Sequence, residues 1–263
     1  MIKRFQLSKL ISRHRPIFRF RIKVRIYVDR TLSCRGSQFV YLERVEKMKV
    51  LVVGANGQIG KYLISFIQGS ASLEAKAMIR KQEQAAYFEY LNAETVVVDL
   101  EQDIETIAKA AEGTDAIVFT AGSGGHTGKD KTILVDLDGA VKTIEAAKIA
   151  GVKRFIMISS FDTRRKAIQA APPSFAPYVA VKHYADEWLK STDLDYTIIH
   201  PGALSNEKGT GLVNAAYEVD RGGIPREDVA SVIVACLENE STIRKEFQVV
   251  TGTKPIKDAM KLI

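Results

Sequence analysis

The chain has 263 residues, which is enough for one large domain or two small ones with a well-buried core. Hydrophobic residues make up 46% and charged residues 26% of it, as in an ordinary soluble globular protein. No stretch approaches the roughly 20 apolar residues of a membrane span. The two cysteines, Cys34 and Cys236, are too few and too far apart for a disulfide framework or a structural zinc site. A reducing, cytoplasmic setting without a bound metal is therefore expected.

The net charge of +7 is unevenly distributed along the chain. Residues 1–47 hold 13 of the 38 basic and 3 of the 31 acidic residues, a balance of +10, which leaves 25 basic and 28 acidic residues, a balance of −3, for the rest. The pI of 9.3 is therefore no argument for nucleic-acid binding by the body of the protein, and nothing there indicates a membrane partner.

The first 47 residues have two interpretations. Residues 18–28 alternate apolar and cationic side chains, so the segment would be a cationic arm for a membrane surface or nucleic acid, or an organelle transit peptide. Alternatively, translation begins at Met48, which opens directly into an apolar strand, and the preceding segment is dispensable. In both cases we expect residues 1–47 to lie outside the fold and residues 48–263 to form one domain.

From Met48 onward, strands alternate with helices. The expected strands cover 49–53, 75–79, 95–98, 116–120, 154–159, 196–200 and 246–251. The expected helices cover 60–68, 82–91, 104–111, 134–150, 178–191 and 225–239. Nearly continuous apolar strands separated by helices indicate a parallel sheet that is covered on both faces. We therefore predict an α/β fold, a doubly wound parallel sheet in a single domain with a small C-terminal cap, and we expect Trp188 and the aliphatic residues of helix 134–150 in the core.

Three glycines follow the first strand at intervals of three residues, in the sequence Gly-Ala-Asn-Gly-Gln-Ile-Gly. In this pattern one glycine permits the tight turn, one lets the backbone approach a pyrophosphate, and one lets helix and strand pack closely. The helix N-terminus then presents free N–H groups and a partial positive charge to the phosphates. The pattern predicts a dinucleotide-binding Rossmann domain. Its expected cradle comprises Gly54, Asn56, Gly57, Gln58, Ile59 and Gly60.

The end of the second strand indicates which dinucleotide is bound. An acidic residue there would bind the ribose 2′-hydroxyl of NAD, but this chain has Arg80 and Lys81. A guanidinium grips a 2′-phosphate with two hydrogen bonds, so NADP(H) is favoured over NAD(H), unless both residues are simply solvated charges that open a helix. Asp99 and Leu100 follow the third strand, where Asp99 would either accept from the adenine amino group or serve as a cap or turn residue.

Tyr178 and Lys182 stand four residues apart, which places them on one face of a helix. An ammonium group beside a phenol helps the phenol to exchange a proton. Upstream, Ser159 and Ser160 follow a strand, where a hydroxyl would bind a substrate carbonyl oxygen. The order of glycine turn, strand-ending serine and Tyr-x-x-x-Lys carries more weight than each motif alone.

In these motifs the body, about residues 48–260, resembles the short-chain dehydrogenase/reductase superfamily. The spacing of its glycines is similar to the extended and atypical branches, and the region after Pro201 and Gly202 is too short for the substrate domain of sugar-nucleotide epimerases. The chain looks most like the small atypical NADP-binding proteins labelled epimerase/dehydratase or NAD(P)H-binding. Three further segments match the family pattern: residues 154–160, 200–203 and 224–230.

The resemblance implies a role for each site residue. Tyr178 would be the general acid/base, Lys182 would hold the nicotinamide ribose, and Ser160 would bind the reacting oxygen, with Ser159 in its place if the alignment slips by one. The expected groove is lined by Thr120, Ala121 and Gly122 and backed by Pro201 and Gly202. One position departs from the family, because Asp136 stands where an Asn is expected. A carboxylate donates no hydrogen bond unless it is protonated, which puts the full proton relay in doubt.

The leading interpretation is an NADP(H)-dependent oxidoreductase that transfers a hydride to or from a small carbonyl or alcohol substrate, with Tyr178 exchanging the proton. The alternatives are a noncatalytic NADP(H)-binding sensor and a nucleotide-sugar-type epimerase or dehydratase without net redox change. His126 and His183 are expected to take no part in the chemistry. The sequence leaves the substrate and the oligomeric state open, because the pocket is built from variable loops around 123–130, 164–177 and 204–223.

Overall fold

The computed structural model of the chain describes residues 47–125 and 127–263. The segment 1–46 and His126 lie outside the described residues, so both interpretations of the basic extension stay predictions. Among the helices of the described part, none combines the length and the apolarity that a membrane span requires.

The first half of the domain alternates strands and helices as the sequence predicts. Its elements are β1 (Met48–Val53), α1 (Gln58–Gln68), β2 (Leu73–Ile79), the 3-10 turn η1 (Gln82–Gln84), α2 (Ala85–Tyr90), β3 (Glu94–Val97), α3 (Ile104–Ala111) and β4 (Ala116–Phe119). Asp103 caps α3, accepting a hydrogen bond from the amide of Thr106 at 2.7 Å. The predicted bounds agree with these elements to within two residues, except at the start of α2.

The second half contains more elements than the sequence predicts. They are α4 (Lys129–Lys131), the π-helix η2 (Thr132–Asp138), α5 (Gly139–Ile149), β5 (Arg154–Ile158), α6 (Arg165–Ala170), α7 (Ala176–Lys190), β6 (Asp195–Pro201), β7 (Ala203–Ser205), β8 (Leu212–Ala216), β9 (Gly223–Pro225), α8 (Arg226–Leu237), η3 (Glu240–Thr242), β10 (Lys245–Thr251), β11 (Lys254–Pro255) and α9 (Ile256–Met260). The additional strands, β7, β8, β9 and β11, are short and belong to the C-terminal third.

The central sheet has nine strands in the order β11-β8-β10-β6-β5-β4-β1-β2-β3. All neighbours from β10 to β3 pair in parallel, whereas β8 is antiparallel to both β10 and β11. The chain moves outward from β1 to β2 and β3, then returns to β4 on the other side of β1. The predicted doubly wound parallel sheet is thus confirmed, with an antiparallel edge that the sequence analysis missed. The order reverses between β1 and β4, where such folds bind their ligands.

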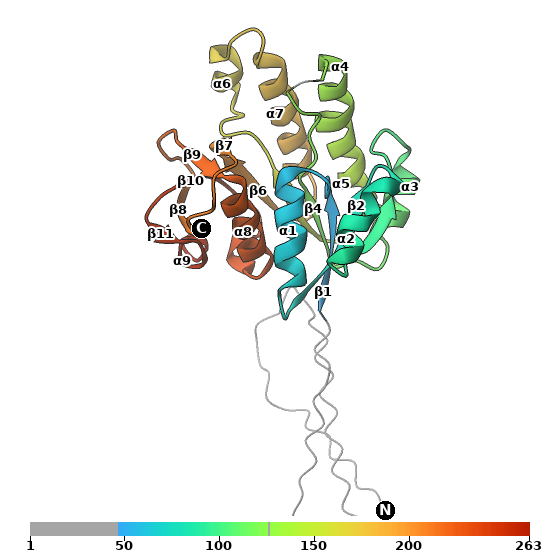
Figure 1. The fold of residues 1–263 in the computed structure, drawn as a ribbon. Helices are drawn as coiled ribbons and strands as arrows, with labels where there is room; N and C mark the ends of the chain where they lie inside the picture. The colour runs from blue at the N-terminus through green and yellow to red at the C-terminus, as the bar shows by residue number, and fades with distance from the viewer. Residues whose placement is uncertain (1–46, 126) are drawn as a thin grey trace, which may run out of the picture. The chain divides into compact units, whose positions relative to one another are not determined.

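Helices cover both faces of this sheet, as Figure 1 shows. Helices α1, α2, α8 and α9 contribute to the apolar core on one face, and α3, α5 and α7 to the core on the other. Alternate residues of β1 enter the two cores, with Val50 and Val52 on the first side and Leu51 and Val53 on the second. A strand that is buried on both faces favours apolar residues at every position, which is why Val50–Val53 of β1 form a continuous apolar run.

The predicted helix 134–150 differs from the structure. Its first part belongs to the π-helix Thr132–Asp138, and a regular α-helix begins only at Gly139. The wider turn of a π-helix inserts extra backbone without changing the apolar spacing enough to be read from sequence. The expectation that its aliphatic residues are all core is also wrong, since Ile149 is 62% exposed.

The expected burial of Trp188 is wrong as well. Its side chain is 47% exposed, and its indole N–H donates to Glu145 at 3.0 Å. The buried residues of α7 include Val181, Ala185 and Leu189, which repeat every four residues. Trp188 lies beside these residues and bridges to α5 at the surface.

The expected small cap after β6 consists of short strands. Ala203–Ser205 and Gly223–Pro225 pair in parallel as a separate two-stranded sheet, while β8, between them in sequence, joins the main sheet next to β10. This stretch is rich in glycine and polar residues, so the period-2 apolar pattern that marks a strand is weak there.

Arg154 connects the central strands to the C-terminal part of the domain. It opens β5, is 2% exposed, and donates to the carbonyl oxygens of Asp195 at 2.8 Å and Cys236 at 2.9 Å, and to the hydroxyl of Thr242 at 3.2 Å. Burial lowers the pKa of its guanidinium to about 10. The arginine therefore stabilises the fold by pairing carbonyl groups that β6 and α8 would leave without partners.

Replacing Arg154 tests this role. Arg154→Met is expected to lower the free energy of unfolding by about 3 kcal/mol, because buried carbonyl groups lose a charged donor. Lys153→Met is the matched control, since that side chain is 58% exposed and pairs with Asp193 at the surface, so its loss is expected to stay within about 1 kcal/mol. Urea denaturation followed by circular dichroism measures both, and equal losses would contradict the role of Arg154.

Candidate active site

The glycine turn between β1 and α1 is shaped by close backbone contacts. Gly54 has a left-handed φ of +84°, and a Cβ atom there would lie 2.6 Å from the amide nitrogen of Ala121. A Cβ at Gly60 would lie 2.5 Å from the carbonyl oxygen of Ala55. Gly57 closes the turn by donating its amide to the Gly54 carbonyl at 2.9 Å. Side chains are therefore excluded at Gly54 and Gly60, which lets the backbone stay exposed to a ligand.

The first turn of α1 offers backbone donors to an anion. The helix begins at Gln58, no side chain caps it, and its first turn contains no acidic residue. Asn56, Gly57 and Gln58 are exposed, whereas the side chain of Ile59 is buried in the core, so only its backbone faces the turn. An uncapped helix N-terminus attracts phosphate, and this arrangement fits the pyrophosphate of a dinucleotide.

The segment after β4 forms the opposite wall of this turn. Thr120 donates its hydroxyl to the carbonyl of Val53 at 3.0 Å, and Ala121 makes the close contact with Gly54. A Cβ at Gly122 would lie 3.1 Å from Oδ1 of Asp136, so a larger residue there would press on that carboxylate. The three predicted groove residues therefore run from the glycine turn to Asp136.

Asp136 and Lys182 form a buried pair next to this wall. Both are at most 3% exposed, and Oδ1 of Asp136 lies 3.8 Å from the ammonium of Lys182. Lys182 also donates to the carbonyl of Ile158 at 3.1 Å, and the other carboxylate oxygen of Asp136 accepts the amide of Ser123 at 3.0 Å. Asp136 acts here as an acceptor and counter-charge, not as the donor that an asparagine would supply. The π-helix brings its carboxylate to this position.

Tyr178 lies one helical turn before Lys182 on α7. It is partly exposed, and its ring packs against that of Phe175 with the centroids 5.2 Å apart. In the described part of the chain, its hydroxyl has no hydrogen-bond partner. Tyr178 is thus one helical turn from the residue that carries the buried ammonium, and the joint action of the two groups stays a prediction.

The two serines after β5 have different environments. Ser159 is buried and donates its hydroxyl to Asp186 at 2.7 Å, whereas Ser160 is partly exposed and its hydroxyl has no partner among the described residues. The alternative alignment, in which Ser159 would bind the substrate, is therefore disfavoured, and Ser160 is the serine available to a ligand.

The residues predicted around the adenosine half lie at the ends of β2 and β3. Arg80 and Lys81 are exposed, and both donate their backbone amides to the side chain of Gln84. Lys81 lies 3.7 Å from Glu83, while the guanidinium of Arg80 has no ion-pair partner in the described residues. Asp99 accepts the amide of Glu101 at 3.1 Å, so its turn role is observed, and Leu100, next to it, is buried in the core.

Pro201 ends β6 and Gly202 follows it, and β4 and β5 separate that strand from β1 in the sheet. Both are buried, and a Cβ at Gly202 would lie 2.3 Å from the carbonyl oxygen of Gly222. The glycine is thus needed where the chain passes β9, and its expected contact with a nicotinamide stays a prediction.

A buried polar cluster that the sequence did not predict contacts the segment around Ser160. Asp186 is 1% exposed and accepts Ser159 and Thr163 through one carboxylate oxygen, while its other oxygen has no partner in the described residues. Burial raises the pKa of this carboxyl group. Asp186 follows Tyr178 and Lys182 at the same four-residue spacing, so a continued helical row was the signal that could have revealed it.

His200 belongs to the same cluster, and its Nδ1 lies 2.7 Å from the carbonyl oxygen of Ser160. Its Nε2 faces Glu246 at 3.8 Å, an ion-pair distance too long for a hydrogen bond. Burial opposes the charged imidazole, but Glu246 and Asp186 outweigh it, and the pKa of His200 is raised. The pKa of Glu246 is lowered to about 2, because it faces His200 and Lys190. The sequence signal was a histidine directly after the two apolar residues Ile198 and Ile199 of β6.

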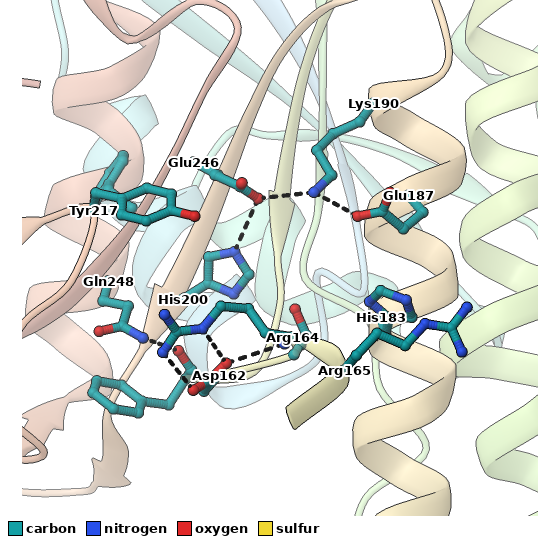
Figure 2. A pocket seen from close by; sticks show the side chains of 13 residues that line it. Asp162, Arg164, Arg165, His183, Glu187, Lys190, His200, Tyr217, Glu246 and Gln248 are labelled. Atoms are coloured by element: carbon teal, nitrogen blue, oxygen red, sulfur yellow. Dashed lines mark hydrogen bonds and ion pairs between the residues drawn. The ribbon is translucent and has the colours of Figure 1, made fainter. Parts of the chain in front are cut away.

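A pocket of about 230 Å³ lies beside α7, over β6 and β10, and Figure 2 shows how its side chains converge. Glu246 stands between His200 and Lys190, and Arg164 pairs with Asp162 on the near side. The charges in the pocket are of both signs and largely paired with each other. His183, which we expected to take no part in the chemistry, lines this pocket instead of facing Tyr178.

Comparison with known proteins agrees with this geometry. Residues 54–240 match the NAD(P)H-binding family. The uncharacterized sugar epimerase YhfK of Bacillus subtilis is 50% identical over 214 residues, which cover 81% of this chain and 99% of the relative. A solved structure from Bacillus halodurans, with a provisional name of NAD-dependent epimerase/dehydratase, is 43% identical with a TM-score of 0.78 and covers 82% of this chain and 100% of its own.

A second solved structure is the oxidoreductase ylbE from Lactococcus lactis, which is 35% identical with a TM-score of 0.75 and covers 82% of this chain and 96% of its own. The matched region begins at Gly54 and thus includes the glycine turn, the segment after β4 and the row on α7. The chain belongs to the NAD(P)H-binding family of Rossmann-fold proteins, among relatives named as epimerases and oxidoreductases.

Proposed function

We propose that this protein is an NADP(H)-dependent oxidoreductase of the atypical short-chain dehydrogenase/reductase type, acting on a small carbonyl or alcohol substrate. The observation that carries the proposal is the buried ammonium of Lys182, which Ile158 and Asp136 hold. Tyr178 lies one helical turn earlier on α7, and its hydroxyl has no partner among the described residues. Burying a lysine is unfavourable unless its charge is compensated, so this arrangement is a feature of a functional site. The bound nicotinamide would supply or accept the hydride.

Each residue of the site then has a distinct task. Tyr178 gives a proton to the substrate oxygen, or takes it, and the hydroxyl of Ser160 holds that oxygen by a hydrogen bond. Lys182 binds the nicotinamide ribose and keeps a positive charge beside the phenol. Asp136 compensates Lys182 and, through its bond to the amide of Ser123, holds the segment after β4 against the cofactor.

Arg80 would select the phosphorylated dinucleotide, with Lys81 as a helper. The guanidinium is exposed directly after β2, where an NAD-binding chain would have an acidic residue to bind the ribose hydroxyl. Asp99 and Leu100 would border the adenine. A short-chain dehydrogenase/reductase from Veillonella parvula with the same fold, 16% identical, was solved in complex with NADP. That likeness extends to the fold alone, so the preference rests on Arg80.

A second candidate function is an epimerase or dehydratase with transient hydride transfer. The names of the relatives at 50% and 43% identity favour it. The same Tyr178, Lys182 and Ser160 would serve both reactions, since both move a hydride and a proton at one carbon and its oxygen. Product formation without a net change in nicotinamide absorbance would distinguish the epimerase from the oxidoreductase.

Alanine at Gly54 tests the phosphate cradle. Gly54→Ala is expected to abolish the calorimetric signal of NADPH binding, because its Cβ would collide with the backbone of Ala121. Gly113→Ala is the control: that glycine also has a positive φ, of +71°, but a Cβ there meets nothing within 4 Å. Gly113→Ala is expected to destabilise the fold by about 1 kcal/mol and to leave NADPH binding intact. Retained binding in Gly54→Ala would contradict the cradle.

Tyr178→Phe tests the acid/base. With a panel of aldehydes, ketones and quinones, kcat for NADPH oxidation is expected to fall by about 10²–10⁴-fold, since the proton donor is lost. Calorimetric affinity for NADPH is expected to stay the same, because the ring still packs against Phe175. Tight NADPH binding with no turnover in the unaltered protein, on any of these substrates, would instead favour a noncatalytic sensor.

Arg80→Gln tests the choice of dinucleotide. Removing the guanidinium is expected to weaken NADPH binding by about 10–100-fold, through the loss of charge-assisted hydrogen bonds, and to leave NADH binding unchanged. Lys81→Gln is the matched control and should have a smaller effect, because Lys81 already lies near Glu83. If both variants bind NADPH as the unaltered chain does, Arg80 does not select the cofactor.

A further inference from the structure

Buried side chains from three elements, α7, β6 and β10, form hydrogen bonds with the segment Ser159–Thr163, which contains Ser160. Asp186 of α7 accepts the hydroxyls of Ser159 at 2.7 Å and Thr163 at 2.8 Å. The backbone carbonyl of Ser160 lies 2.7 Å from Nδ1 of His200 on β6. Gln248 of β10 donates to the next carbonyl, that of Phe161, at 2.9 Å. We call Asp186, His200 and Gln248 the clamp.

The clamp engages the backbone and the inward-facing hydroxyls of the segment, but leaves one hydroxyl free. The hydroxyls of Ser159 and Thr163 both donate to Asp186, and Asp162 pairs with Arg164. Within the described residues, the hydroxyl of Ser160 is the side-chain group of this segment that has no partner. The bonds to Asp186 fix both ends of the segment, so the position of Ser160 between them is restricted.

All members of the clamp are buried polar groups on the α7 face of the sheet, where apolar residues would pack without a desolvation penalty. Each is at most 7% exposed, and Asp186 keeps one oxygen without a partner in the described part of the chain. His200 donates to Ser160 only if Nδ1 carries the proton, an assignment that follows from its carbonyl partner. The buried carboxylate and imidazole bond to the same short segment, so they fix the position of that segment.

We propose that Asp186, His200 and Gln248 are positioning residues, which hold the segment Ser159–Thr163 so that the hydroxyl of Ser160 meets the reacting oxygen beside Tyr178. This inference rests on the proposed function. The clamp touches neither substrate nor cofactor and acts through Ser160. Small misplacements of a positioned group lower catalytic rates steeply, so the clamp is expected to affect kcat more than KM.

The decisive comparison is between two histidines of the same pocket. His200→Phe keeps the size of the ring and removes the donor to Ser160, while His183→Phe makes the same change at a buried residue that lines the pocket but has no bond to the segment. His200→Asn is the conservative variant, because its amide N–H lies where Nδ1 of the imidazole was. Gln248→Met removes the second donor without losing length.

Two measurements on the full-length protein are made for each variant. The first is amide hydrogen exchange of the peptide containing residues 159–163, which needs no turnover; exchange is expected to be faster in His200→Phe and Gln248→Met, and unchanged in His183→Phe and His200→Asn. The second is steady-state reduction of phenanthrenequinone by NADPH. Here kcat is expected to fall by about 10–100-fold in His200→Phe, with KM for NADPH unchanged, and to recover within about threefold in His200→Asn.

The outcomes separate the clamp from the proposed function. Unchanged exchange in His200→Phe and Gln248→Met, or equal losses of kcat in His200→Phe and His183→Phe, would overturn the clamp. If Tyr178→Phe keeps full activity, the proposed function fails, whereas the exchange of residues 159–163 still decides whether the clamp holds the segment. Thermal unfolding of each variant identifies one that fails to fold, and His200→Asn and Gln248→Met then carry the comparison.

Discussion

The approach of the β1–α1 turn to the segment after β4 is the constraint on which the candidate site depends. At Gly54 the backbone passes so close to Ala121 that no side chain fits, and Thr120 closes the same junction by donating to the carbonyl of Val53. The junction lies where the strand order of the sheet reverses, and a doubly wound sheet opens a crevice at this point. Glycine here does two things at once, because it permits the contact and leaves the backbone of the turn accessible to phosphate.

From that junction, direct contacts lead to the buried pair of Asp136 and Lys182. Gly122 admits the carboxylate of Asp136, Asp136 faces Lys182, and Lys182 donates to Ile158 at the end of β5. The glycine turn and the buried Lys182 are therefore linked by direct contacts and do not lie on separate loops. The π-helix is the element that makes this continuity possible, since it brings Asp136 to the wall of the crevice, as such helices do at many functional sites.

The sequence was sufficient for the parallel strands and for the glycine turn, because a strand buried on both faces must be apolar and a tight turn must have glycine. It was insufficient in two places. The π-helix at 132–138 has the apolar spacing of an α-helix, and the antiparallel strand β8 pairs with β10, which follows it by about thirty residues. The burial of Asp186 and His200 was not predicted for another reason. Polar residues are expected at the surface, and the burial of these two depends on partners far apart in the chain.

The two candidate functions share the one step for which the described residues are arranged. Under both proposals Tyr178 would exchange a proton at an oxygen that Ser160 would hold, and the reactions would differ in whether the substrate leaves after one hydride transfer or is retained for a second. Retention would depend on the loops around the site, for which the sequence analysis named 123–130, 164–177 and 204–223. Likeness of the framework therefore shows the cofactor family, and these loops would decide the net reaction.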